Sequence, residues 1–187
     1  MGGSFFSYTT MAACSIAGII TQPSTFHSAT ELKIDSSVAI GEELGIFRFQ
    51  TTFLAGSAEI TCTEEKPTIT ITSTFPIESP GIFQTRIPGV GMKITSTAIG
   101  GPLPFTYTSA TNTSVIDHYF IYIITFIKTG YIASGGQLPA GLIAHGYLEN
   151  PGNLPVYDGI LTVPVTLELL RPTCTVNIPN FTVNLGE

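Results

Sequence analysis

Apolar and polar residues alternate along several short stretches of this chain, and this period of two constrains the fold more than any other feature of the sequence. The stretches "AEITCT" (residues 58–63), "TITIT" (residues 68–72) and "VGMKI" (residues 90–94) all follow it. Successive side chains of a β-strand point to opposite faces of the sheet, so each stretch predicts a half-buried strand. "ILTVPVTLELL" (residues 160–170) predicts another strand, in which Pro164 indicates an edge or a bulge because it cannot donate a ladder hydrogen bond.

The stretch "YFIYIITFIK" (residues 119–128) is apolar nearly throughout. A strand covered on both faces or a buried helix could contain such a run, and its β-branched and aromatic residues favour a central strand. Turn-forming clusters, among them "PIESPG", "IPGVG" and "ENPGNLP", separate the predicted strands, and no helical period is present. The sequence therefore predicts an all-β chain that folds as a sandwich of two packed antiparallel sheets.

The composition agrees with this fold class and argues against two kinds of partner. Only 11% of the 187 residues are charged and 43% are hydrophobic, which suits strands and turns in one domain with a substantial core. The net charge is -6 and the basic residues are scattered, so we expect neither nucleic acid nor an anionic membrane surface as a partner. No stretch contains the roughly 18 consecutive apolar residues of a membrane span, so we expect no membrane insertion.

The two ends of the sequence carry processing and domain signals. Residues 1–14 lack the basic region and the continuous apolar segment of an intact secretory signal, so we expect no signal peptide in this sequence. Near the other end, "LRPTC" is the plausible domain boundary, which predicts one domain over residues 1–171 and a separate segment over residues 172–187. The three cysteines are an odd number, so if two form a disulfide, the third pairs outside this chain or remains a free thiol.

The sequence contains no recognisable catalytic motif. It has no Gly-x-Ser-x-Gly elbow, His-Glu-x-x-His, Cys-x-x-Cys or phosphate-cradling loop, so we expect that the chain is not an enzyme. His27, His118 and His145 could converge in space, and three imidazoles can hold zinc. The alternative is that they are structural, because His118 opens an apolar strand and His145 lies within "LIAHGYL". We favour this alternative and expect no metal or other cofactor.

Three stretches together resemble the chaperone–usher fimbrial tip adhesins of Gram-negative bacteria. "FQTRIPGVGMKI" (residues 83–94) is similar to a segment in which a strand passes through a Pro-Gly-aliphatic-Gly turn into the next strand. "ITFIKTGYIASGGQLPAGLIAHGYL" (residues 124–148) resembles the family's strand, Lys-Thr-Gly turn, glycine-rich connection and following strand. "CTVNIPNFTVNLGE" (residues 174–187) resembles the opening of a pilin domain. Their order and spacing cover more than half of the chain.

This resemblance implies an elongated, immunoglobulin-like β-sandwich of Greek-key type, in which residues 1–171 form the receptor-binding domain. In this family a pilin domain follows, which lacks its last strand and is completed by a neighbouring subunit. Residues 172–187 would then be the linker and the first strand of that pilin domain. The resemblance also implies a disulfide between Cys14 and Cys62, and it implies that Cys174 pairs with a residue that this sequence does not contain.

The same resemblance implies where the protein acts and what it contacts. We expect an extracellular location at the fimbrial tip after export through the periplasm. The expected assembly partners are a periplasmic chaperone, the usher and the next fimbrial subunit, all through the missing pilin domain, and the isolated domain is expected to be monomeric. Its receptor is expected to be a host glycan or glycoprotein. The alternative is a structural fimbrial subunit or adaptor that binds only other pilus subunits.

Carbohydrate recognition suggests the candidate contact residues. Sugar hydroxyls need fixed donors and acceptors, and an aromatic ring can pack against the apolar face of a sugar. The stretch "YLENPGNLPVYDG" is the richest in such side chains, and a matching loop supplies sugar contacts in the mannose-binding member of the family. We therefore expect a shallow site on loops far from the linker, with these contacts: Tyr147, Glu149, Asn150, Asn153, Tyr157 and Asp158. Mannose itself is not expected, because this loop differs in sequence and contains two prolines.

Two further places could contact a ligand. Glu64 and Glu65 in "CTEEK" follow the predicted disulfide, at a position similar to a sugar-contacting loop of the same relative. Asp117 precedes the strand that His118 opens. All these candidates also have an ordinary explanation, since "NPGN" and "YDG" are typical of turns and surface charge pairs are usually solvated.

Overall fold

The structure is a computed structural model, and it describes residues 13–17, 21–53, 57–97, 101–116, 119–149 and 152–170. All regular elements among these residues are β-strands, which confirms the predicted all-β class. The predicted second segment, residues 172–187 with Cys174, lies outside the described residues. In the described part of the chain, no helix has the length and apolarity of a membrane span.

The strands in chain order are β1 (Cys14–Ala17), β2 (Thr21–His27), β3 (Glu31–Ile34), β4 (Glu43–Phe53), β5 (Ala58–Cys62), β6 (Thr68–Ser73), β7 (Ile77–Ser79), β8 (Ile82–Gln84), β9 (Val90–Ser96), β10 (Gly101–Pro102), β11 (Phe105–Thr108), β12 (Thr113–Ile116), β13 (Tyr119–Lys128), β14 (Gly136–Leu138), β15 (Gly141–Leu148), β16 (Leu154–Leu161) and β17 (Val165–Leu169).

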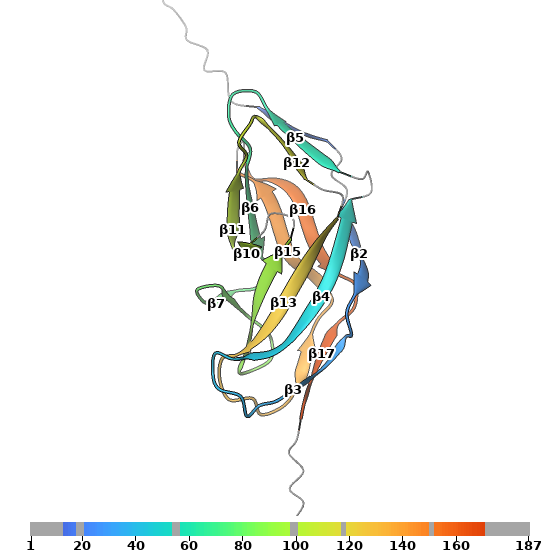
Figure 1. The fold of residues 1–187 in the computed structure, drawn as a ribbon, viewed down its shortest axis with the longest axis vertical. Helices are drawn as coiled ribbons and strands as arrows, with labels where there is room; N and C mark the ends of the chain where they lie inside the picture. The colour runs from blue at the N-terminus through green and yellow to red at the C-terminus, as the bar shows by residue number, and fades with distance from the viewer. Residues whose placement is uncertain are drawn as a thin grey trace, which may run out of the picture.

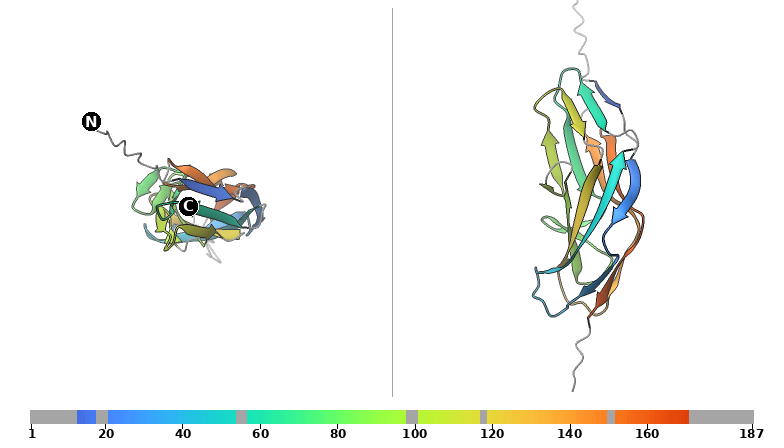
Figure 2. Two further views of the ribbon diagram at one scale, coloured as in Figure 1. Left: turned by 90° about the horizontal axis from the view of Figure 1, so that it is seen from above. Right: turned by 45° about the vertical axis from the view of Figure 1, so that its right-hand side comes forward.

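Two large sheets form the layers of an elongated sandwich (Figure 1, Figure 2). One has seven strands in the order β2-β4-β13-β9-β8-β7, with β10 paired to β9, and the other has four in the order β11-β6-β15-β16. Two smaller sheets, β1-β5-β12 and β14-β17-β3, lie at opposite ends of the long axis (Figure 1). The pairings between described strands are antiparallel except that of β3 with β17, so the antiparallel prediction is correct with one exception.

Strand β13 is central, as the apolar run predicts, because it pairs with β4 on one side and β9 on the other. Its inward side chains Tyr122, Ile124 and Phe126 are fully buried. Its opposite face is less covered than predicted, since Ile121 and Ile123 are half-buried. The run is apolar on both faces, but the sandwich covers one face completely and the other in part.

The predicted strand over residues 160–170 is wrong in one respect, because the structure divides it into β16 and β17. Strand β16 belongs to the four-stranded sheet, whereas β17 pairs with β14 and β3. Pro164 lies between them and lacks the N–H that a ladder would need. The proline therefore marks the point where the chain passes from one sheet to another.

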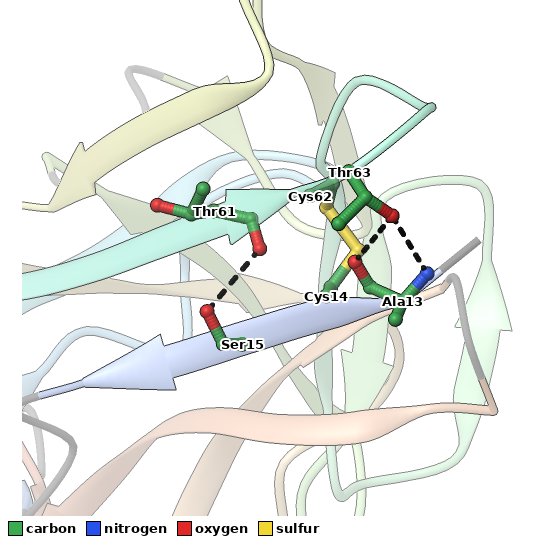
Figure 3. Close-up of a disulfide and its surroundings, with 6 residues drawn as sticks. All are labelled: Ala13, Cys14, Ser15, Thr61, Cys62 and Thr63. Atoms are coloured by element: carbon green, nitrogen blue, oxygen red, sulfur yellow. Dashed lines mark hydrogen bonds between the residues drawn. A yellow bond between two sulfur atoms is a disulfide. The ribbon is translucent and has the colours of Figure 1, made fainter.

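The predicted disulfide between Cys14 and Cys62 is present, with an S–S distance of 2.07 Å (Figure 3). The two cysteines are direct partners in the register of β1 and β5. Beside them, Ala13 N donates a hydrogen bond to Thr63 Oγ1 at 3.3 Å (Figure 3). The bond joins residues 48 positions apart. In the chain-entropy model a loop of that size stabilises the fold by roughly 3 to 4 kcal/mol.

The strand, turn and strand predicted over residues 83–94 are also present as β8 and β9. Gly89 in the turn has a φ of 79°, and a Cβ there would lie 2.4 Å from the carbonyl oxygen of Tyr131. Glycine is therefore required by both its backbone conformation and its neighbour.

Candidate functional site

The outer surface of the four-stranded sheet gathers polar side chains from strands far apart in the sequence. In the register, Tyr147 lies opposite Thr70, and His145 lies between Thr72 on β6 and Asp158 on β16. Because the inward positions of β6 are buried and side chains alternate, these residues face away from the core. We call this surface the polar face; its residues are Thr68, Thr70, Thr72, Thr106, Thr108, His145, Tyr147, Glu149 and Asp158.

A chain of hydroxyl groups crosses the polar face and ends on a carboxylate. The Oγ1 atoms of Thr70 and Thr106 are 2.7 Å apart, and Thr70 Oγ1 donates to Glu149 Oε1 at 2.6 Å. A hydroxyl has a single proton to donate, so Thr70 accepts from Thr106. Thr68 and Thr108 form a second hydroxyl pair at 3.1 Å. The backbone N–H of Glu149 donates to the carbonyl of Thr68, which holds the end of β15 against β6.

An imidazole, a carboxylate and a phenol form the other half of the polar face. His145 Nδ1 is 2.5 Å from Asp158 Oδ1, and both side chains are about one-third exposed, at 34% and 36%. The imidazole ring stacks against that of Tyr147, with 6.1 Å between ring centroids. Since Asp158 engages Nδ1, the proton of a neutral imidazole is held there, and Nε2 is the nitrogen that can meet a ligand. The three groups fix one another's orientation.

The charged groups of the polar face are all acidic. The strands β6, β11, β15 and β16 contain no lysine or arginine, while Glu149 and Asp158 both carry carboxylates. Such a surface repels anions and accepts hydrogen bonds from hydroxyl or ammonium donors.

Four of the predicted site residues therefore come together on one surface: His145, Tyr147, Glu149 and Asp158. Asn153 lies beside them in the turn between β15 and β16, exposed and with a φ of 56°. Such a left-handed conformation is common for asparagine in turns. The site expected on loops is thus built mainly on strands, which hold its side chains more rigidly.

The remaining candidates lie elsewhere. Glu64 and Glu65 are exposed in the connection between β5 and β6, next to the disulfide rather than on the polar face. His27, on β2 of the other large sheet, stacks on Phe47 and its Nδ1 lies 2.9 Å from the carbonyl of Ser28. Candidates Asn150, Asp117 and His118 lie outside the described residues. Within the described ranges, no group of three or more His, Cys, Asp or Glu side chains could hold a metal.

Tyr157 is placed differently from its neighbour Asp158, because its side chain is only 1% exposed. A register shift between Gly146 and Tyr147 lets both Val156 and Tyr157 point inward. The Tyr157 ring covers Gly146, where a Cβ would lie 2.9 Å from it. Burial raises the pKa of the Tyr157 hydroxyl, an effect that a hydrogen bond with Ser96 partly opposes. Tyr157 thus packs against the inner face of the sheet and is not available to a ligand in this structure.

The threonines are the part of the polar face that sequence reasoning missed. The alternation of "TITIT" predicts the strand and its outward threonines, but not what they face. Only the pairing with residues 106–108 and 145–148 shows that they extend the site.

Comparisons with known proteins support the fold. No protein-family model matches the sequence, and no curated protein matches it. The structure is similar to the receptor binding domain of the plasmid-born adhesin MrkD1P of Klebsiella pneumoniae, with 16% identity and a TM-score of 0.60 over 88% of this chain and 99% of that one. The likeness shows a shared fold over most of both chains, so the expected resemblance to a fimbrial receptor-binding domain is confirmed at the level of fold.

Two more distant solved structures are also adhesins. The Ambient Temperature Fimbriae adhesin AtfE of Proteus mirabilis has 14% identity and a TM-score of 0.41, over 75% of this chain and 94% of that one. The CupB6 tip adhesin from Pseudomonas aeruginosa has 14% identity and a TM-score of 0.37, over 84% of this chain and 51% of that one.

Proposed function

We propose that this chain is the receptor-binding domain of a fimbrial tip adhesin, and that it recognises a host-surface glycan with its polar face. The observation that carries the proposal is the convergence of Thr70, Glu149, His145, Tyr147 and Asp158 on one rigid sheet surface. The fold shared with the MrkD1P receptor binding domain supports the same reading.

The groups of the polar face match what a sugar presents. Neighbouring sugar hydroxyls can donate to the carboxylates of Glu149 and Asp158, and the threonine hydroxyls can both donate and accept. The half-buried Tyr147 ring offers a surface for the apolar face of a sugar ring. The side chains are fixed by one another before a ligand arrives, which lowers the entropy that binding costs.

The charge of the polar face favours a neutral or basic sugar. No cation on these four strands could offset a ligand carboxylate or sulfate, and both fixed charges are negative. A shallow, exposed site of this kind binds a single sugar weakly. Many fimbriae on one cell would raise the effective affinity through multivalency.

In this proposal the domain works outside the cell, at the fimbrial tip, after export through the periplasm. A chaperone, the usher and the next subunit are its assembly partners through a pilin domain, and a glycoprotein can carry the receptor glycan. Strand β17 ends at the end of the long axis opposite the disulfide (Figure 1). A domain attached through β17 would extend its disulfide end away from the fimbria and present the polar face along its side.

A glycan-array screen of this domain tests the proposal, followed by titration of the best sugar against variants. Glu149→Gln and Asp158→Ala should each weaken binding about tenfold, because a charge-assisted hydrogen bond contributes roughly that factor. The matched control is Glu168→Gln, which changes an exposed carboxylate on β17 in another sheet. Its binding should equal that of the unmodified domain.

Undiminished binding in both polar-face variants would remove this surface from consideration. If no glycan binds and the domain instead binds another pilus subunit, the structural alternative replaces the adhesin.

A further inference from the structure

A groove of about 410 Å³ lies between the end of the β7–β8 hairpin and the turn from β14 to β15, and no residue of the polar face lines it. Pockets of a few hundred Å³ are large enough for a small ligand. Its lining comes from three segments: the residues that follow β6, the end of β8 with the residues after it, and the turn before β15 with the first residues of that strand. The hairpin projects from the side of the sandwich in Figure 1.

Arg86 is the charged residue of the groove. It is exposed, and it is the sole ionisable side chain among the lining residues. Among the residues that the structure describes, no carboxylate pairs with its guanidinium. The chain has a net charge of -6, so an arginine in a hollow that has no carboxylate partner is unusual. Its guanidinium is suited to bind a carboxylate of a ligand.

The nearest acidic side chain on the hairpin, Glu78, faces a different hollow. That hollow borders the groove, since both are lined by Gln84 and Thr85, but Arg86 does not line it. The Glu78 Oε2 atom lies 3.0 Å from the position that a Cβ on Gly91 would take, which places it over β9. Glu78 therefore does not neutralise Arg86, and the guanidinium can bind an anionic group in the groove.

The other walls of the groove suit a sugar ring. Gln84 is exposed and supplies an amide that can donate and accept. Phe75 is half-buried and Leu142 is 41% exposed, so both present apolar surface. The Thr74 hydroxyl donates to the carbonyl of Leu142 at 2.6 Å, and this bond joins the segment that follows β6 to the start of β15.

We propose that this groove is a second binding site, and that it takes a sugar bearing a carboxylate, such as a sialic or uronic acid. The guanidinium of Arg86 binds the carboxylate, Gln84 binds ring hydroxyls, and Phe75 with Leu142 packs against the apolar side of the ring. This site is complementary in charge to the polar face, which carries two carboxylates and no cation. It does not depend on the polar face being a glycan site.

Titration with 3′-sialyllactose and with lactose tests the charge requirement. The unmodified domain should bind 3′-sialyllactose more tightly than lactose, with NMR shift changes at Gln84, Arg86 and Leu142. Arg86→Gln should weaken 3′-sialyllactose about tenfold and leave lactose unchanged, because it removes a charge-assisted bidentate contact. The matched control Arg48→Gln removes an exposed arginine from β4 and should have no effect.

Three results would overturn the proposal. One is that neither 3′-sialyllactose nor glucuronic acid produces shift changes in the groove. Another is that Arg86→Gln and Arg48→Gln weaken binding equally, which would show an effect of net charge alone. The third is that a hexaglutamate peptide binds the groove more tightly than either sugar, which would assign it to acidic peptides. The variant Glu149→Gln separates the two sites, since it should leave this binding intact.

Discussion

The two faces of the four-stranded sheet are built from alternate residues of the same strands, yet they depend on different kinds of interaction. On the inner face, Ile69, Ile71 and Tyr157 are at most 1% exposed and belong to the hydrophobic core. On the outer face, the hydroxyl of Thr70, a residue only 8% exposed, is hydrogen-bonded to the carboxylate of Glu149, which solvent reaches. Changes on the inner face should therefore alter folding, while changes on the outer face should alter recognition.

The largest effect is expected where the inner face has no room for a single methyl group. Gly146→Ala would place a Cβ 2.9 Å from the Tyr157 ring, which is held in the core and cannot easily yield. Overpacking of this kind lowers the free energy of unfolding by about 1 to 3 kcal/mol. Urea unfolding followed by circular dichroism measures it.

The control for this change is Gly45→Ala on β4, where the new Cβ would lie an ordinary 3.7 Å from Leu32. It should be neutral or slightly stabilising. Equal losses in both variants would show that backbone flexibility, rather than the packing of the inner face, sets the cost.

A second effect should appear at alkaline pH. Burial raises the pKa of both Tyr122 and Tyr157 above the ordinary value of 10.0. The unfolded chain therefore releases these protons at lower pH than the folded chain does, so the stability that they contribute is complete below pH 10 and is lost as the pH rises further. Urea midpoints measured from pH 8 to 11 should fall above pH 10, and Tyr157→Phe should reduce that fall.

The exposed Tyr131, at 86% accessibility, supplies the matched control. Tyr131→Phe should leave the alkaline profile unchanged. A profile that Tyr157→Phe does not alter would show that the inner face is not the source of the pH dependence.

The smallest effect on stability is expected on the outer face. Thr70→Val keeps the branched shape that suits a strand and removes the hydroxyl between Thr106 and Glu149. Thr70 is itself buried, but both partners are exposed and can turn to water, so the free energy of unfolding should fall by only about 0.5 to 1 kcal/mol. Glycan binding should still fall several-fold, because the Glu149 carboxylate loses the contact that orients it.

Thr61→Val, at an exposed position on β5, is the control for this variant and should change neither quantity. A large loss of stability in Thr70→Val, with binding otherwise intact, would contradict the expectation that the outer face serves recognition and the inner face serves folding.

The period of two predicted several of the strands, because alternation is a local property of a strand. It predicted β5, β6 and β9 within a few residues, and the apolar run predicted β13 as a central strand. The division at Pro164 could not be predicted, since leaving one sheet for another depends on which strands lie nearby. A proline in the sequence indicates that a strand is interrupted, but it does not indicate which sheet the chain joins next.

The candidate site was predicted in part for a similar reason. Tyr147, Glu149 and Asp158 lie close together in the sequence, so one stretch was enough to select them, whereas His145 was expected to be a structural histidine. The hydrogen bond between Thr70 and Glu149 spans 79 positions and depends on the register between β6 and β15. The Tyr157 side chain points inward because of a bulge, and no residue type near it in the sequence predicts that bulge.

The parallel pairing of β17 with β3 has a mechanical consequence if the domain is tethered through the end of β17 and binds through the polar face, as proposed above. Tension that enters at the end of β17 acts along the strand, while its ladder hydrogen bonds to β3 and β14 lie across that direction. Those bonds must then be sheared together instead of being peeled apart one after another. Beyond β17 the chain passes Pro164 and enters β16, the strand that carries Asp158, so only the short connection over residues 162–164 separates the loaded strand from the polar face.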